Sequence, residues 1–175
     1  MVHGGGCPPS SFIEESAGNP EPHLSTKKFS DSAPYEKNFP VQAQQSGERF
    51  DNWTFPEIEE GKPTKYNWVV QNKAGLKLGY KTDIGAFSYI NAKYGVTIDD
   101  FVQIGSHCSI YSISTIDDKI GPVTLKKGCR VGSHSLIMPG VTIGENAVIG
   151  AFSFVNRDIP PGALAVGVPV KVIKN

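Results

Sequence analysis

The sequence has no long apolar run and no recognisable targeting segment. No stretch approaches the roughly 20 consecutive apolar residues that a membrane-spanning helix needs. The start, Met1 to Ser10, lacks the basic and apolar segments of a signal peptide. We therefore expect a cytoplasmic protein that has no membrane partner.

The sequence also has no excess of charge, because 17 basic residues balance 17 acidic ones. A chain without net charge has no long-range field that would draw it onto nucleic acid or an anionic membrane. We therefore expect no nucleic-acid partner, and any phosphate group must be bound by a local cluster of charges.

Cysteine is scarce, and its spacing indicates no structural site. The three cysteines are Cys7, Cys108 and Cys129. Their number is odd and no two form a Cys-x-x-C pair, which disfavours a disulfide framework or a zinc site. Free thiols are expected.

The first part of the chain lacks any repeating pattern. Residues 1 to about 45 are rich in Pro, Ser, Glu, Gln and Lys and show no sustained period of 2 or 3.6. Such a segment cannot bury enough apolar surface to offset its ordering entropy alone. We expect residues 1–75 to be an irregular N-terminal extension, with a flexible start at the His3-Gly-Gly-Gly-Cys stretch.

Aromatic residues gather where this extension ends, at Phe50, Trp53, Phe55, Tyr66 and Trp68. We expect them to cap the open end of the following domain or to pack on a neighbouring subunit. The alternative is that one of them stacks on a substrate base or sugar ring.

From about Leu78 onward the chain repeats every six residues, with an aliphatic residue in the first place of each hexad. The first places are Leu78, Ile84, Ile90, Ile98, Ile104, Ile110, Ile116, Leu125, Val131, Ile137, Ile143, Ile149 and Val155. A period of six fits neither a helix nor the strict alternation of an ordinary strand. It fits a parallel β-helix, in which each coil buries its aliphatic row against the next coil. We therefore predict an all-β fold, with this domain at residues 76–160.

Two further places of the hexad carry characteristic residues: a small or aliphatic residue in the fifth place and, in many hexads, glycine in the second. The fifth places are Thr82, Ser88, Val102, Cys108, Ser114, Cys129, Ser135, Val141, Ala147 and Ser153. Glycine follows the aliphatic residue at Gly79, Gly85, Gly105, Gly132, Gly144 and Gly150. We expect these glycines to supply an unusual backbone angle at tight corners. The register slips by two residues between Ile90 and Ile98 and by three between Ile116 and Leu125. The second slip predicts an external loop at residues 117–124.

The segment from Val131 to Gly162, with the closing stretch from Ala165 to Lys174, resembles the hexapeptide-repeat acyltransferases. This family includes galactoside and maltose acetyltransferases and the N-acyltransferases of bacterial surface sugars. The resemblance implies a left-handed parallel β-helix and a homotrimer, with an active site in each cleft between two subunits. It also implies acetyl-CoA as the co-substrate, lying along the coils.

The resemblance further implies which residues contact CoA. Ser133 and Ala151 would lie beside the pantetheine arm, and the adenine end would lie near Asn156, Arg157, Lys171 and Lys174. The two lysines belong to a C-terminal segment, residues 161–175. Cationic side chains suit the CoA phosphates, while the alternative for the lysines is solvated surface charge.

One departure from the O-acetyltransferases of this family bears on the acceptor. Those enzymes carry a catalytic histidine in a Gly-His-Pro stretch after the matching coil, but this chain has Ser112-Ile-Ser-Thr-Ile-Asp-Asp there. An alcohol acceptor needs a general base, a contribution of roughly 10²- to 10⁴-fold in rate. A neutral amine is already a nucleophile, so the missing histidine favours an amine.

The stretch from Tyr111 to Asp118 resembles the amino-sugar N-acyltransferases of the same family. The resemblance implies that Asp117 is the catalytic residue that holds the acceptor, with Asp118 and Tyr111 as further substrate contacts. The alternative is that the two aspartates only turn a loop. The predicted function is acetyl transfer from acetyl-CoA to an amino group of a nucleotide-linked amino sugar, in surface-polysaccharide or glycan biosynthesis.

Two other functions stay open. His107 occupies an outward place of its hexad and could be the general base of a sugar O-acetyltransferase. A non-catalytic assembly domain is the other alternative. His134 is expected at the trimer interface, and the repeat region has too few histidines for the three-histidine zinc site of carbonic anhydrases, so no metal is expected.

Overall fold

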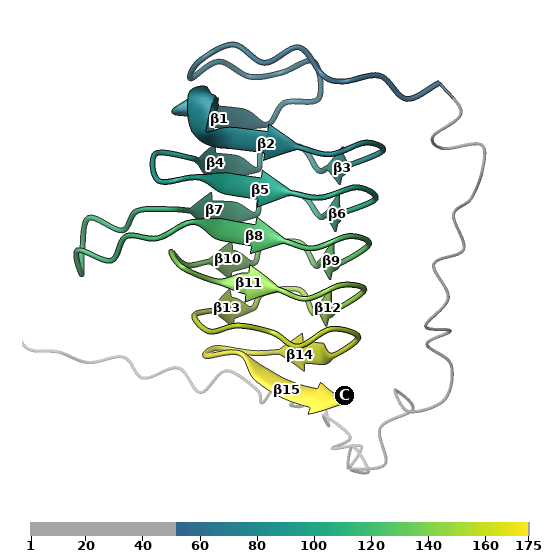
Figure 1. Cartoon of the computed structure of the whole chain (residues 1–175), viewed down its shortest axis with the longest axis vertical. Coiled ribbons are helices and arrows are strands. Elements are labelled where there is room, and N and C mark those ends of the chain that lie inside the picture. Colours follow the sequence, from purple (N-terminus) through teal and green to yellow (C-terminus); the bar gives the residue numbers. More distant parts are fainter. Residues whose placement is uncertain (1–51, 175) are drawn as a thin grey trace, which may run out of the picture. The chain divides into compact units, whose positions relative to one another are not determined.

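The computed structural model describes residues 52–174, which form a parallel β-solenoid (Figure 1). The predicted features at Cys7, at the His3 stretch and at Phe50 lie outside the described residues. Three sheets run along the stack, and the chain passes from sheet A to sheet B to sheet C in each coil except the last, which has no sheet B strand. The predicted all-β parallel helix is thereby confirmed. No helix among residues 52–174 has the length and apolar character of a membrane span.

The strands are short, because each side of a coil holds only one hexad. Sheet A contains β1 (Val69–Gln71), β4 (Tyr89–Asn91), β7 (Ser109–Tyr111), β10 (Leu136–Ile137) and β13 (Phe154–Val155). Sheet B contains β2 (Leu76–Leu78), β5 (Val96–Ile98), β8 (Val123–Leu125) and β11 (Thr142–Ile143). Sheet C contains β3 (Asp83–Ile84), β6 (Gln103–Ile104), β9 (Arg130–Val131), β12 (Val148–Ile149), β14 (Leu164–Val166) and β15 (Lys171–Lys174). A single 3-10 turn among the described residues, η3 (Lys73–Gly75), leads into β2.

The aliphatic first places of the hexads line the interior. Ile90 on β4 pairs with Ile110 on β7, and Ile110 pairs with Ile137 on β10, so that identical side-chain types stack from coil to coil. These three isoleucines are 0–1% exposed. Trp68, at 2% exposed, joins the same core just before β1, as expected of a residue that caps the open end.

Two of the predicted inward positions are wrong. Ile116 is 96% exposed and Ser114 is not buried. The coil ends earlier, at the buried Ser112, whose hydroxyl donates to the Asn91 carbonyl at 2.8 Å and accepts from the Tyr94 amide at 2.9 Å. The external loop therefore spans residues 113–122, and Val123 and Thr124, expected in the loop, belong to β8.

The glycines that follow the aliphatic residues serve a different purpose from the one predicted. None of the six has a positive φ, whereas the corner residues two places later do, among them Phe87 at 63° and His134 at 60°. The glycines are required by the stacking of the coils: a Cβ at Gly132 would lie 2.4 Å from the Ala151 nitrogen. A Cβ at Gly85 would lie 2.4 Å from the Ser106 nitrogen of the next coil.

Gly132→Ala should therefore destabilise the solenoid by about 1–3 kcal/mol, because the added methyl group pushes two coils apart. Unfolding in urea at one fixed protein concentration measures the effect. Gly162→Ala is the matched control, since Gly162 has a φ of 70° but no atom within 4 Å of the added Cβ. The control should lose about 1 kcal/mol, the cost of a left-handed alanine without a clash, and therefore less than Gly132→Ala. Equal unfolding midpoints for wild type and Gly132→Ala would contradict the stacking explanation.

Candidate functional site

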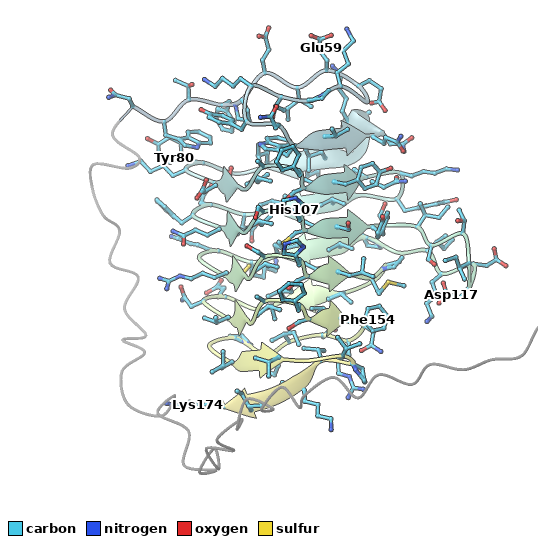
Figure 2. All side chains as sticks on the ribbon, turned by 180° about the vertical axis from the view of Figure 1, so that it is seen from behind. Glu59, Tyr80, His107, Asp117, Phe154 and Lys174 are labelled. Atoms are coloured by element: carbon cyan, nitrogen blue, oxygen red, sulfur yellow. The ribbon has the colours of Figure 1, made fainter. Side chains whose placement is uncertain are left out.

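The loop at residues 113–122 is a small hairpin that leaves the corner between sheets A and B, here called corner AB (Figure 2). Its two arms meet at an antiparallel bridge between Ile113 and Ile120. The Ser114 amide donates to the Lys119 carbonyl at 2.8 Å. Asp118 has a φ of 53°, a conformation that aspartate tolerates in turns. The hairpin thus has a defined backbone that presents Asp117 away from the coils.

Asp117 is held as a carboxylate by two residues of the same hairpin. Its Oδ2 lies 2.7 Å from the Lys119 Nζ. The Lys119 ammonium and then the Ser114 hydroxyl lower the pKa of Asp117. Because its pKa is lowered, Asp117 is ionised at neutral pH and is a poor proton acceptor, but it can bind an ammonium, an amine N–H or a hydroxyl. Both partners are exposed, so another donor can replace Lys119 at low cost.

Tyr111 lies at the base of the hairpin, on the outer face of sheet A. Its ring centroid is 5.6 Å from that of Tyr89, in a tilted pair. The Tyr89 hydroxyl is hydrogen-bonded to Gln71, and the Asn72 side-chain amide donates to Asn91 at 3.0 Å. Burial and then the neighbouring Tyr111 raise the pKa of Tyr89. This face of amides and phenols, with the Glu60 carboxylate accepting from the Asn72 backbone amide at 2.6 Å, was not predicted, although the outward places of successive hexads could have indicated part of it.

Four rings form a column on the corner between sheets C and A, here called corner CA. Phe87 lies 5.0 Å from His107, His107 lies 4.7 Å from His134, and His134 lies 4.7 Å from Phe152, all between ring centroids. The rings of His134 and Phe152 are parallel within 2°. Within residues 52–174 neither imidazole has a hydrogen-bond partner to orient it. His107 therefore lacks the second group that usually positions a general base.

Ser133 and Ala151 directly precede two members of this column. Their side chains are small, and their backbone N–H groups donate no hydrogen bond within residues 52–174. Unused backbone donors beside a small side chain suit the amide or thioester carbonyl oxygens of an acyl-CoA. Both nitrogens lie against a glycine of the preceding coil, Gly105 and Gly132, and their contact with CoA stays a prediction.

The four residues predicted near adenine lie at the C-terminal end of the stack. Asn156 and Arg157 follow β13 of sheet A and are exposed. Lys171 and Lys174 are the first and last residues of β15 in sheet C, and they are exposed as well. Within one chain, sheet A separates Asn156 and Arg157, which follow β13, from Ser133 and Ala151 on the corner before sheet A.

Residues 122–157 match the family model described as bacterial transferase hexapeptide (six repeats). Galactoside O-acetyltransferase of Escherichia coli is 55% identical over 53 residues, which are 30% of this chain and 26% of that enzyme.

Two solved structures are similar in fold. One is a hexapeptide-repeat acetyltransferase of Vibrio cholerae in complex with acetyl-CoA, with a TM-score of 0.59 and 26% identity, covering 62% of this chain and 64% of that chain. The other is an N-acyltransferase of Bacillus cereus with dTDP and 3-hydroxybutyryl-CoA, with a TM-score of 0.51 and 26% identity, covering 62% and 76%. A variant of the latter enzyme was solved with dTDP-4-amino-4,6-dideoxyglucose and coenzyme A, at a TM-score of 0.52 and 26% identity, covering 62% and 76%.

The chain spans about a quarter of the length of the first curated relatives that it matches, at 26% and 29%. The matched portion lies in the later coils and includes the Ser133 and Ala151 corner.

Lys119→Met should raise the pKa of Asp117, because it removes the largest cause of the lowered value. The ion pair stabilises the folded hairpin only where Asp117 is ionised. Because the folded-state pKa is lowered, this stabilisation is lost as the pH falls through that pKa. Carboxyl-carbon NMR titration of the full chain measures the shift. Lys126→Met, a change outside the hairpin, is the control and should leave the pKa of Asp117 unchanged. An unmoved pKa in Lys119→Met would show that the ion pair does not hold in solution.

Proposed function

We propose that this chain, which carries the hexapeptide-repeat domain of bacterial transferases, transfers an acetyl group from acetyl-CoA to an amino group of a nucleotide-linked amino sugar. The observation that carries the proposal is the pairing of two features on one solenoid. Corner CA offers unused backbone donors at Ser133 and Ala151, and the hairpin offers an ionised Asp117. The hairpin belongs to the stretch in which the sequence departs from the O-acetyltransferases that it resembles. The relatives that bind acetyl-CoA or a dTDP amino sugar support the choice of substrates.

In the proposed reaction the acceptor nitrogen attacks the thioester carbonyl carbon. The carbon–sulfur bond then breaks, an amide forms, and the CoA thiolate takes up the proton that the nitrogen loses. Backbone N–H groups at Ser133 or Ala151 stabilise the oxyanion, an effect worth about 3 kcal/mol per donor. No separate general base is needed for an amine that arrives neutral.

Asp117 orients the acceptor in this scheme. Its carboxylate accepts a hydrogen bond from the amine or from a neighbouring sugar hydroxyl, in place of Lys119. Because its pKa is lowered, its contribution is positioning rather than proton abstraction. Tyr111 and Asp118 lie beside it, at the base and the turn of the hairpin, where they can contact the sugar or its nucleotide.

We further propose that the site is shared between copies of the chain in a homotrimer. In one chain the hairpin leaves corner AB while Ser133 and Ala151 lie on corner CA, so the whole of sheet A separates them. The hairpin tip carries Ile116 at 96% exposed, and corner CA carries Phe152 at 67% exposed. Contact between copies covers both apolar surfaces and brings Asp117 of one copy to the acyl group bound by the next.

A sugar O-acetyltransferase is the second candidate, supported by the match to galactoside O-acetyltransferase and by the exposed imidazole of His107 close to the Ser133 corner. A non-catalytic assembly domain is the third. The two enzymatic functions differ in whether a general base is needed, and the assembly domain transfers no acetyl group, so the three can be separated by experiment.

His107→Ala should lower the rate of acetyl transfer to dTDP-4-amino-4,6-dideoxyglucose by less than about tenfold, because an amine needs no general base. Release of free thiol from acetyl-CoA measures the rate, and a galactoside is tested as the acceptor in a separate reaction. Transfer to the galactoside that falls by about a thousandfold in the variant would instead establish O-acetylation through His107. No thiol release with any acceptor, and no heat on titration with CoA, would leave only the assembly domain.

Asp117→Asn should lower kcat by about 10- to 100-fold, since a neutral amide holds the acceptor less firmly than a carboxylate. The affinity for CoA, measured by calorimetry, should change by less than about twofold. Asp118→Asn is the matched control from the same turn, and its kcat should fall much less than that of Asp117→Asn. Full activity in Asp117→Asn would refute the role assigned to this carboxylate.

A further inference from the structure

The third corner of the solenoid, between sheets B and C, carries an aromatic cluster that the acyl-transfer site does not use. The cluster consists of Trp53, Phe55, Tyr80 and Phe101. Ring centroids are 4.8 Å apart for Trp53 and Phe55, 5.2 Å for Trp53 and Tyr80, and 6.4 Å for Tyr80 and Phe101, and every pair is edge-to-face. Phe55 is 62% exposed and Tyr80 is 47% exposed. Adjacent exposed rings of this kind mark an interaction surface rather than scattered surface residues.

The cluster is held rigidly by the first coil. The Trp53 indole N–H donates to the Thr82 carbonyl at 2.8 Å, which ties residues 53–55 to corner BC. The Tyr80 amide donates to an Asp100 carboxylate oxygen at 2.7 Å. Each edge-to-face contact leaves part of a ring face open, so the corner presents preformed aromatic surfaces.

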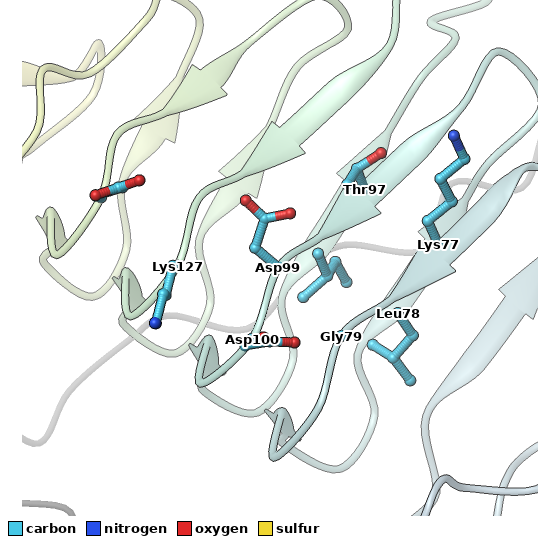
Figure 3. Close-up of a pocket in the computed structure, with 9 residues that line it drawn as sticks. Lys77, Leu78, Gly79, Thr97, Asp99, Asp100 and Lys127 are labelled. Carbon is cyan, nitrogen blue, oxygen red and sulfur yellow. The ribbon is translucent and has the colours of Figure 1, made fainter.

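A cavity of about 390 Å³ lies against the same corner (Figure 3). Its polar lining consists of Lys77, Thr97, Asp99, Asp100, Lys127 and Glu145. The rings of the cluster do not line the cavity, but Lys127 links the two: it lines the cavity, and its Nζ lies 5.6 Å from the Phe101 centroid. Two other lining residues, Gly79 and Asp100, are the chain neighbours of Tyr80 and Phe101. The cavity is distinct from the transfer site, whose groups belong to corners AB and CA.

This combination of groups selects a class of ligand. Carboxylates only accept hydrogen bonds and ammonium groups only donate them, so together they satisfy hydroxyl groups, which do both. The presence of both signs disfavours a polyanion such as nucleic acid. Flat aromatic surface beside hydroxyl-binding groups matches a pyranose ring, which has an apolar C–H face and a rim of hydroxyls. We propose that corner BC binds a neutral saccharide, separately from the acyl-transfer site.

The Lys81 and Lys127 ammonium groups now lie near ring faces, at 5.5 Å from the Tyr80 centroid and 5.6 Å from the Phe101 centroid. Both side chains are long and can move aside at low cost, with their ammonium groups turning to donate to sugar oxygens. The occupied ring faces are therefore available to a saccharide.

Saturation-transfer NMR of the full chain with maltotriose and with chitotriose tests the proposal. Wild type should bind at least one of them with a Kd in the millimolar range, and Tyr80→Phe should bind equally well because the ring is kept. Tyr80→Ala should weaken binding about tenfold, the loss expected of one stacking contact. Tyr66→Ala is the matched control, since Tyr66 is 49% exposed but outside the cluster.

Transfer of acetyl groups to a small acceptor should be unchanged in Tyr80→Ala, which also shows that the variant is folded. No binding of either trisaccharide by wild type would overturn the proposal, as would equal binding by wild type and Tyr80→Ala. Light scattering measures the assembly size of each protein. If wild type binds neither saccharide and Tyr80→Ala forms a smaller assembly than wild type, the corner is instead a contact with a second copy.

Discussion

The close approach of successive coils is the constraint on which the rest of this structure depends. Backbone hydrogen bonds join each coil to the next, as between the Gly85 amide and the Ile104 carbonyl at 2.8 Å. At Gly132 the next coil is so near that a single added carbon would meet the Ala151 nitrogen at 2.4 Å. Inward aliphatic residues fill the interior only at this spacing. Because no extra residue fits within the ladder, the ten residues from 113 to 122 must leave it and form a hairpin.

The same constraint gives each corner of the solenoid its own chemistry. Corner CA carries stacked rings and unused amides, corner AB carries the hairpin with Asp117, and corner BC carries an aromatic cluster beside polar groups. Stacking keeps the coil corners in a rigid arrangement, which suits the positioning of a long donor such as CoA. Lys119 and Asp117 are both exposed on the hairpin, so an acceptor can displace Lys119 from Asp117 without disturbing the core.

Much of the proposed site could be predicted from the sequence, but its electrostatics could not. Asp117 and Tyr111 belong to a recognisable stretch of the chain, whereas the hydrogen bond from Ser114 to Asp117 and the pairing of Tyr89 with Tyr111 depend on the hairpin and on the next coil. Ile116 shows the limit of the hexad pattern. It is an aliphatic residue in the correct place of the period, yet it is exposed because Ser112 ends the coil by bonding to Asn91 one coil away.

The sequence by itself determined the period of six and the inward rows of side chains, because whether a residue faces the interior depends on its place in its own hexad. Only the tertiary structure decided why the glycines are needed, where the coil ends and which rings gather at each corner. Those features arise between residues about one coil apart, as with His107 and His134 or Tyr80 and Phe101. A pattern read along the chain contains no distance between such residues, and that distance exists only after the coils have stacked.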